Sequence, residues 1–327
     1  MSKKTLTWRV FGVSALVVTV LAGVLAIPPS HTVFATPAQP ATDWSFYIET
    51  LDTGTASTLG CNQGKFDQSV YPYRNSEVVL DFGDERDSSG DTILTFDNLP
   101  ATVSEIESVT TSFAEAYWSC TGNDGTSLLK LGVGTNNSGY TPTYTTGVAW
   151  ANIVAAIRST VQSRGWSSQV DVFGANDIEP DWSAWSDTNA WIQGYSSVDP
   201  AHYLDYGSAD GCSTSSDDPN RPCNNGWTMD NVWEASWGAA PALAIPEIYN
   251  TAQPLQWTQI ALDGAHRYGG AVYYEGPWDE HDLNSSTNTS AQAWSLFWND
   301  LNSYSSIAQT PIFSAEIHME SCPQTGC

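Results

Sequence analysis

The chain has 327 residues, and its 11 Lys and Arg residues stand against 36 Asp and Glu residues, which gives a net charge of -25 at pH 7. A surface this acidic repels nucleic acid and anionic membranes, so we expect neither as a partner. Neutral ligands, cations and sugars remain possible, and the 15 Trp and 14 Tyr residues suit the stacking of sugar rings.

Residues 1–35 have the pattern of a secretory signal peptide. Lys3, Lys4 and Arg9 precede an uncharged apolar run over residues 10–27, and small or apolar residues follow at 33–35, where a signal peptidase would cut. An uncleaved membrane anchor is the alternative, because about 18 apolar residues are just enough to span a bilayer. The pattern favours cleavage, no membrane contact afterwards, and a protein that is secreted or held at the cell surface.

The rest of the chain is expected to form one domain. Residues 36–43 are a short linker rich in Pro, Ala and Thr, and residues 44–320 contain no low-complexity linker and no repeat of fixed period. That length is normal for a single α/β barrel. Residues 321–327 form a short C-terminal tail.

Six cysteines follow the signal peptide, and an even number in an exported chain indicates disulfides. Short separations, and elimination for the last pair, favour Cys212–Cys223, Cys322–Cys327 and Cys61–Cys120. No two cysteines have C-x-x-C spacing and the histidines are scattered, so we expect no zinc site, no other bound metal and no cofactor.

Eight short runs rich in β-branched or aromatic residues read as strands, each bounded by Gly, Pro, Asn or Asp. They cover residues 44–49, 78–82, 128–133, 170–175, 202–206, 242–249, 271–275 and 312–317. Helical periodicity lies between most of them, at residues 103–118, 148–164, 187–195, 229–237, 254–268 and 290–301. Residues 51–77 look like a loop that carries a cysteine.

Alternation of strands and helices requires parallel strands joined by helical crossovers. Eight strands in one α/β domain predict a single (β/α)8 TIM-like barrel with disulfide-stapled loops. The first strand has no G-x-G-x-x-G turn after it, which disfavours a dinucleotide-binding, doubly wound sheet.

Acidic residues fall at or near the C-terminal ends of the expected strands. These acids are Glu49, Asp81, Asp177, Glu179, Asp205, Glu247, Glu275 and Glu316. The strand ends of a barrel converge on the face that carries the active site. Crowded carboxylates raise one another's pKa, so one carboxyl stays protonated beside an ionised neighbour, as cleavage of a glycosidic bond requires.

The richest segment is residues 170–185, VDVFGANDIEPDWSAW. Here the chain resembles the TIM-barrel glycoside hydrolase superfamily, whose retaining members often carry Asn-Glu-Pro at the end of the fourth strand. In this chain Asp177 and Ile178 are inserted between Asn176 and Glu179. By the resemblance, Glu179 is the general acid/base.

The resemblance also implies a second carboxylate from the seventh strand. By our count this is Glu275 in AVYYE, with Trp278 after it as an aromatic platform. Glu247, in the sixth run ALAIPEIYN, is the rival, because an error of one strand would exchange the two. We rank Glu275 slightly ahead of Glu247.

The expected reaction is retaining hydrolysis of a neutral glycan by a monomer. The residues expected to bind the sugar are Asn176, Asp177, Asp205, Trp182, Tyr249 and Trp278. Three other interpretations remain, of which a metal-dependent hydrolase would need a His/Asp cluster that we do not see in the sequence. Strand-end acids commonly cap helices or bond loop amides, so Asp205 and Asp81 could simply support the mouth of the barrel. The whole chain could also be a secreted carbohydrate-binding or cell-surface barrel without catalysis.

Residues 279–282, Asp-Glu-His-Asp, offer oxygen ligands of the kind that bind Ca²⁺. They lack the spacing of an EF-hand loop. We interpret them as a solvated loop.

Overall fold

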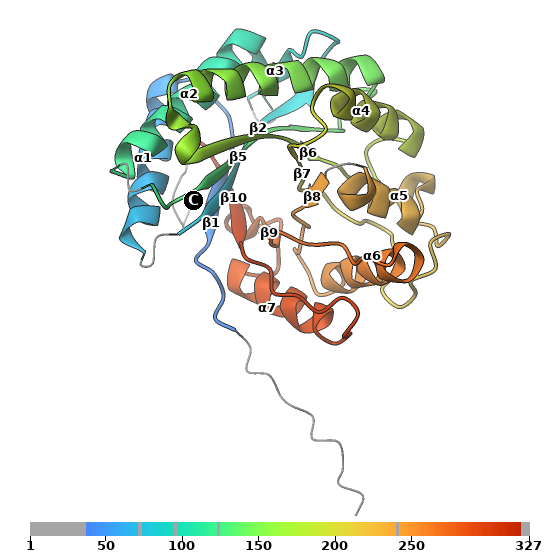
Figure 1. Ribbon diagram of the computed structural model, residues 1–327. Helices are drawn as coiled ribbons and strands as arrows, with labels where there is room; N and C mark the ends of the chain where they lie inside the picture. The colour runs from blue at the N-terminus through green and yellow to red at the C-terminus, as the bar shows by residue number, and fades with distance from the viewer. Residues whose placement is uncertain (1–36, 71–73, 95–96, 123–124, 240–241, 322–327) are drawn as a thin grey trace, which may run out of the picture. The chain divides into compact units, whose positions relative to one another are not determined.

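The computed structural model describes residues 37–70, 74–94, 97–122, 125–239 and 242–321. The expected signal peptide and the Cys322–Cys327 pair lie outside these residues. Within them, strands and helices alternate along the chain (Figure 1).

Parallel strands form the centre of the domain. They are β1 (Asp43–Tyr47), β2 (Ser76–Glu85), β5 (Leu129–Asn136), β6 (Val170–Asp177), β7 (Tyr203–Asp205), β8 (Ala242–Ala244), β9 (Trp278–Asp279) and β10 (Ala315–Met319). Their order is β8-β7-β6-β5-β2-β1-β10-β9. Isolated parallel bridges pair Ala244 with Tyr274 and Glu247 with Trp278, next to the two ends of that order. The sheet curves as at least half of a barrel, and its C-terminal strand ends share one side.

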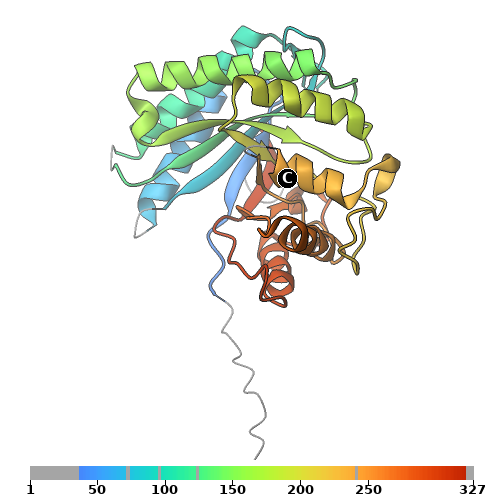
Figure 2. The same cartoon turned by 45° about the vertical axis from the view of Figure 1, so that its right-hand side comes forward.

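Helices cover the outer side of this sheet (Figures 1 and 2). They are α1 (Thr53–Ser69), α2 (Val103–Cys120), α3 (Tyr144–Ser163), α4 (Trp185–Val198), α5 (Met229–Trp233), α6 (Gln253–Tyr268) and α7 (Ser290–Leu301). Thr143, Thr228 and Thr289 start three of them as capping boxes, in which side chains satisfy backbone N–H groups of the first turn. None of the helices in the described ranges is long and apolar enough to cross a membrane.

Short elements complete the fold. They are the antiparallel strands β3 (Thr92–Ile93) and β4 (Pro100–Ala101), the 3₁₀ turns η1 (Trp166–Ser168), η2 (Asn224–Gly226) and η4 (His281–Leu283), and the π-helical turn η3 (Glu234–Gly238).

Side chains of the strands alternate between two apolar layers. The inner layer includes Val79, Ala175, Leu204, Ile245 and Ile317. The residues between them along each strand join the larger layer under the helices. This alternation of period two decides which strand residues face the inside of the curved sheet.

Helix α1 occupies residues that we predicted to be a loop. Asp52 caps it by accepting a hydrogen bond from the Thr55 amide at 2.8 Å. Its apolar pattern is weak because glycine makes part of its contact with α2: a Cβ on Gly60 would lie 2.2 Å from the Phe113 carbonyl oxygen.

The structure contains the predicted Cys61–Cys120 disulfide, which joins α1 to α2. It also contains the predicted Cys212–Cys223 disulfide.

The first six predicted strands overlap the observed ones, whereas β9 and β10 begin further toward the C-terminus than the last two predicted strands. The run at 271–275 precedes β9 rather than forming it, since Gly276 and Pro277 separate the two. A Cβ on Gly276 would lie 2.3 Å from the Phe313 carbonyl oxygen, so this passage is tightly packed. At the other end of the domain, β1 begins at Asp43, one residue inside the expected linker.

Candidate active site

Three carboxylates meet beyond the C-terminal ends of β6 and β8. Asp177 ends β6, Glu179 follows two residues later, and Glu247 comes three residues after β8. One oxygen atom from each lies within 4.8 Å of the others. Asp177 and Glu247 are buried and Glu179 is half-buried. The structure therefore brings together three residues that the sequence singled out.

The surroundings of Glu179 favour its protonated form. Burial raises the pKa of its carboxyl to about 8, and the negative charges of Asp210 and Glu280 add to the effect. Desolvation and like charges both disfavour the ionised state. A carboxyl that keeps its proton at neutral pH can act as a general acid.

Glu247 lowers the pKa of Glu179 through a side-chain hydrogen bond, and Glu247 has a contact of this kind of its own. Burial raises its pKa well above the ordinary value, and the charges of Glu179 and Glu280 raise it further. The Tyr249 hydroxyl donates a hydrogen bond to Glu247 Oε1 at 2.9 Å, and this lowers the pKa. A donor to a carboxylate stabilises its charged form, so Tyr249 favours the ionised state of Glu247. Tyr249, which we expected to bind the sugar, therefore lies beside Glu247.

Glu280 is a functional candidate that the sequence analysis missed. It directly follows β9 and accepts a hydrogen bond from the Tyr47 hydroxyl of β1. Its charge raises the pKa of both Glu179 and Glu247. Glu280 belongs to the acidic run at 279–282. It can be recognised as a strand-end acid only when β9 is known to end at Asp279.

Asn137 fixes the backbone that carries Glu179. Its side-chain amide donates to the Glu179 carbonyl at 3.1 Å and accepts from the Glu179 N–H at 3.1 Å. The Asn137 N–H also bonds the Asp177 carbonyl at 3.2 Å. Trp182 lies in the same turn and is 39% exposed, so its ring is accessible for stacking.

Glu275 does not face Glu179, against our first-ranked expectation. Its carboxylate lies 2.8 Å from the Nζ atom of Lys130, the second residue of β5. That contact places Glu275 at the N-terminal ends of the strands, opposite the three carboxylates. The cause is that the seventh strand is β9 and not residues 271–275. The chain reaches the C-terminal ends of the strands only after Asp279.

Three other expected sugar contacts also lie elsewhere. Trp278 is 1% exposed and packs on Tyr206 with the ring centroids 4.9 Å apart, so it has no free face. Asp205 accepts a hydrogen bond from Ser236 of η3 at 2.7 Å, on the helix side of the sheet. Asn176 is buried and is the register partner of Asp205, on that same side.

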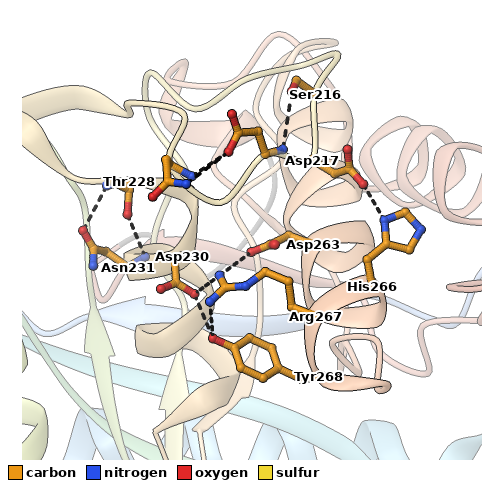
Figure 3. Close-up of polar contacts among 11 residues, drawn as sticks. Ser216, Asp217, Thr228, Asp230, Asn231, Asp263, His266, Arg267 and Tyr268 are labelled. Atoms are coloured by element: carbon orange, nitrogen blue, oxygen red, sulfur yellow. Dashed lines mark hydrogen bonds and ion pairs between the residues drawn. The ribbon is translucent and has the colours of Figure 1, made fainter.

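A second polar group lies on the outside, along α6 (Figure 3). Arg267 pairs there with Asp230 and lies 3.4 Å from Asp263, while His266 lies 2.6 Å from Asp217. Most of these side chains are at least a third exposed, and ion pairs of that kind contribute little to stability. We assign this group no part in the candidate active site.

No protein-family model and no curated protein matches this chain. Among solved structures, the crystal structure of the endo-1,4-beta-mannanase from Rhizomucor miehei is similar over 88% of this chain and 87% of its own. The two are 11% identical and superpose with a TM-score of 0.41. An overlap this loose assigns no reaction to this chain.

Proposed function

We propose that this chain is a secreted, retaining glycoside hydrolase that cleaves a neutral polysaccharide or oligosaccharide on a complete (β/α)8 barrel. The observation that carries the proposal is the approach of Asp177, Glu179 and Glu247 to within 4.8 Å. Retaining enzymes hold their two carboxyl groups about 5–5.5 Å apart, and inverting enzymes about 6.5–9.5 Å. The close approach of oxygen atoms of Glu179 and Glu247 leaves little room for the water of an inverting enzyme, so we favour the retaining reaction.

In this mechanism Glu179 is the acid and Glu247 the nucleophile. Glu179 protonates the glycosidic oxygen while a Glu247 oxygen attacks the anomeric carbon, so the bond to the leaving sugar breaks as a glycosyl ester forms. Glu179, now ionised, takes a proton from water, and that water cleaves the ester and restores both groups. Trp182 stacks on a sugar ring near the turn, and Asp177 and Glu280 accept hydrogen bonds from sugar hydroxyls.

The charge of the site supports a neutral substrate. None of the ion pairs in the described part of the chain joins a Lys or Arg to Asp177, Glu179, Glu247 or Glu280. An anionic glycan would meet only like charge in a poorly solvated place, where repulsion is strong.

A screen of the mature protein against neutral polysaccharides, with reducing ends as the readout, tests the proposal. We expect Glu179→Gln and Glu247→Gln each to lower kcat by about 10²–10⁴-fold with an unchanged circular dichroism spectrum. Glu115→Gln, an exposed acid on α2, is the matched control and keeps full activity. Full activity in Glu179→Gln would sink the assignment. Glycan binding without hydrolysis by the wild type would favour the non-catalytic alternative.

A further inference from the structure

A second cluster of ligand-type side chains lies between β9, β10 and the start of α7. It consists of Asp282 in η4 and of Glu316 and His318 in β10. One possible ligand atom from each lies within 4.8 Å of the others. Ala315 and Ile317 face the inner side of the sheet, so Glu316 and His318 face the helices. The cluster is therefore separate from the three carboxylates of the candidate active site.

His318 is a buried imidazole directed at this cluster. It is 2% exposed, and its Nε2 atom has no hydrogen-bond partner among the described residues. Its Nδ1 atom lies 3.8 Å from Asp282 Oδ2, which also lacks a hydrogen-bond partner there. That distance is too long for a hydrogen bond. It suits two atoms that bind one ion, each at about 2.0–2.2 Å.

Glu316 is held in place by other contacts. Its two oxygens accept hydrogen bonds from the Asp282 N–H at 3.0 Å and from the Ser290 hydroxyl at 2.6 Å. Partners of this kind orient the carboxylate of a metal site. Asp279, the register partner of Glu316 on β9, is fully buried beside it. Buried acids crowded in this way either keep a proton or take up a counter-charge.

We propose that Asp282, Glu316 and His318 bind a divalent transition-metal ion. An imidazole beside two carboxylates favours zinc or a neighbouring first-row metal over Mg²⁺ and Ca²⁺, which prefer oxygen alone. The ion ties the turn after β9 to β10, and Glu280 stands at the start of that turn, two residues before Asp282. The site therefore orders the segment that carries Glu280. This proposal contradicts two predictions from the sequence, namely that residues 279–282 form a solvated loop and that the chain binds no metal.

Titration of the chelator-treated mature protein with Zn²⁺, followed by calorimetry and by the melting temperature, tests this site. We expect one tight site and a higher melting temperature with zinc. His318→Gln and Asp282→Asn should each weaken the affinity at least about tenfold. His266→Gln is the matched control, because His266 also stands beside an aspartate but on the exposed α6 (Figure 3), and it should bind zinc as the wild type does.

Absence of zinc binding by the wild type would overturn the proposal. Unchanged affinity in Asp282→Asn would overturn it as well. This variant decides the matter if His318→Gln does not fold, since the Asp282 side chain is 19% exposed and that of His318 only 2%. Loss of the tight site only in Glu247→Gln would place the ion among the active-site carboxylates instead. None of these measurements depends on hydrolytic activity, so failure of the proposed function would leave them intact.

Discussion

Lys130 and Glu275 form an ion pair with 2.8 Å between Nζ and Oε2, at the N-terminal ends of the parallel strands. Glu77, the second residue of β2, lies 4.0 Å from the same Nζ. Burial, followed by the charge of Glu275, raises the pKa of Glu77 well above its ordinary value. One lysine thus contacts two buried acids, one in β2 and one in the segment before β9, and we assign this group a role in stability rather than in catalysis.

We predict that Glu275→Gln keeps full activity, while Glu247→Gln loses it. Lys130→Met should lower the free energy of unfolding by about 3 kcal/mol, because it leaves buried acids without a counter-charge. Urea unfolding and the hydrolysis assay measure the two effects separately. Loss of activity in Glu275→Gln at unchanged stability would return this residue to the active site.

Tyr249→Phe tests whether Glu247 is the ionised nucleophile and Glu179 the protonated acid. Without the hydroxyl donor the charged form of Glu247 is less stable and its pKa rises. One hydrogen bond of about 1 kcal/mol corresponds to somewhat less than one pKa unit. We therefore expect the acidic limb of the pH profile of kcat/KM to move upward by about that amount. Tyr268→Phe, at a half-exposed ring on α6, is the control, and an equal shift there would contradict the assignment.

Asn137→Ala should act on catalysis through the position of Glu179. The variant loses both side-chain hydrogen bonds to the Glu179 backbone. A small displacement of an acid costs up to about 10²-fold in rate, so we expect kcat to fall while KM changes little. The melting temperature should also drop, because a buried group left without its hydrogen-bond partner costs about 1–3 kcal/mol of stability. Asn152→Ala, at an exposed position on α3, should change neither quantity. A higher KM at unchanged kcat would instead assign Asn137 to substrate binding.

The sequence predicted the part of the site that depends only on parallel topology. Asp177 ends β6, and Glu179 and Glu247 come after β6 and β8; such strand ends meet whatever the details of the loops. Asp205 was wrongly expected to bind the sugar because its strand, β7, has only three residues. So short a strand does not show which side chains face the inside of the sheet. Alternation from Leu204, which lies in the inner layer, puts Asp205 on the helix side.

The sequence analysis selected Glu275 and missed Glu280 for a similar reason. The run before Gly276 is richer in aromatic and β-branched residues than the two-residue strand β9, so it looked like the strand. Asn137 carried no local signal at all, because its partner lies 42 residues away in sequence. Contacts of that range come from tertiary packing.

The buried acids also predict how stability changes with pH. Burial raises the pKa of Asp81 to about 7 and that of Asp205 to about 7. It raises the pKa of Glu85 to about 8. The folded state therefore binds more protons than the unfolded state between the ordinary carboxyl pKa of about 4 and these values. The free energy of unfolding falls as pH rises through that window.

We expect a higher melting temperature at pH 5 than at pH 8, and Glu85→Gln isolates one contribution. The Glu85 carboxylate accepts a hydrogen bond from Trp191 Nε1 at 3.0 Å, which an amide oxygen can also accept. The variant cannot ionise, so its melting temperature should fall less between pH 5 and pH 8 than that of the wild type. Glu115→Gln, at the exposed site on α2, should leave the slope unchanged. An identical slope in Glu85→Gln and the wild type would mean that Glu85 ionises in the folded state as easily as in the unfolded chain.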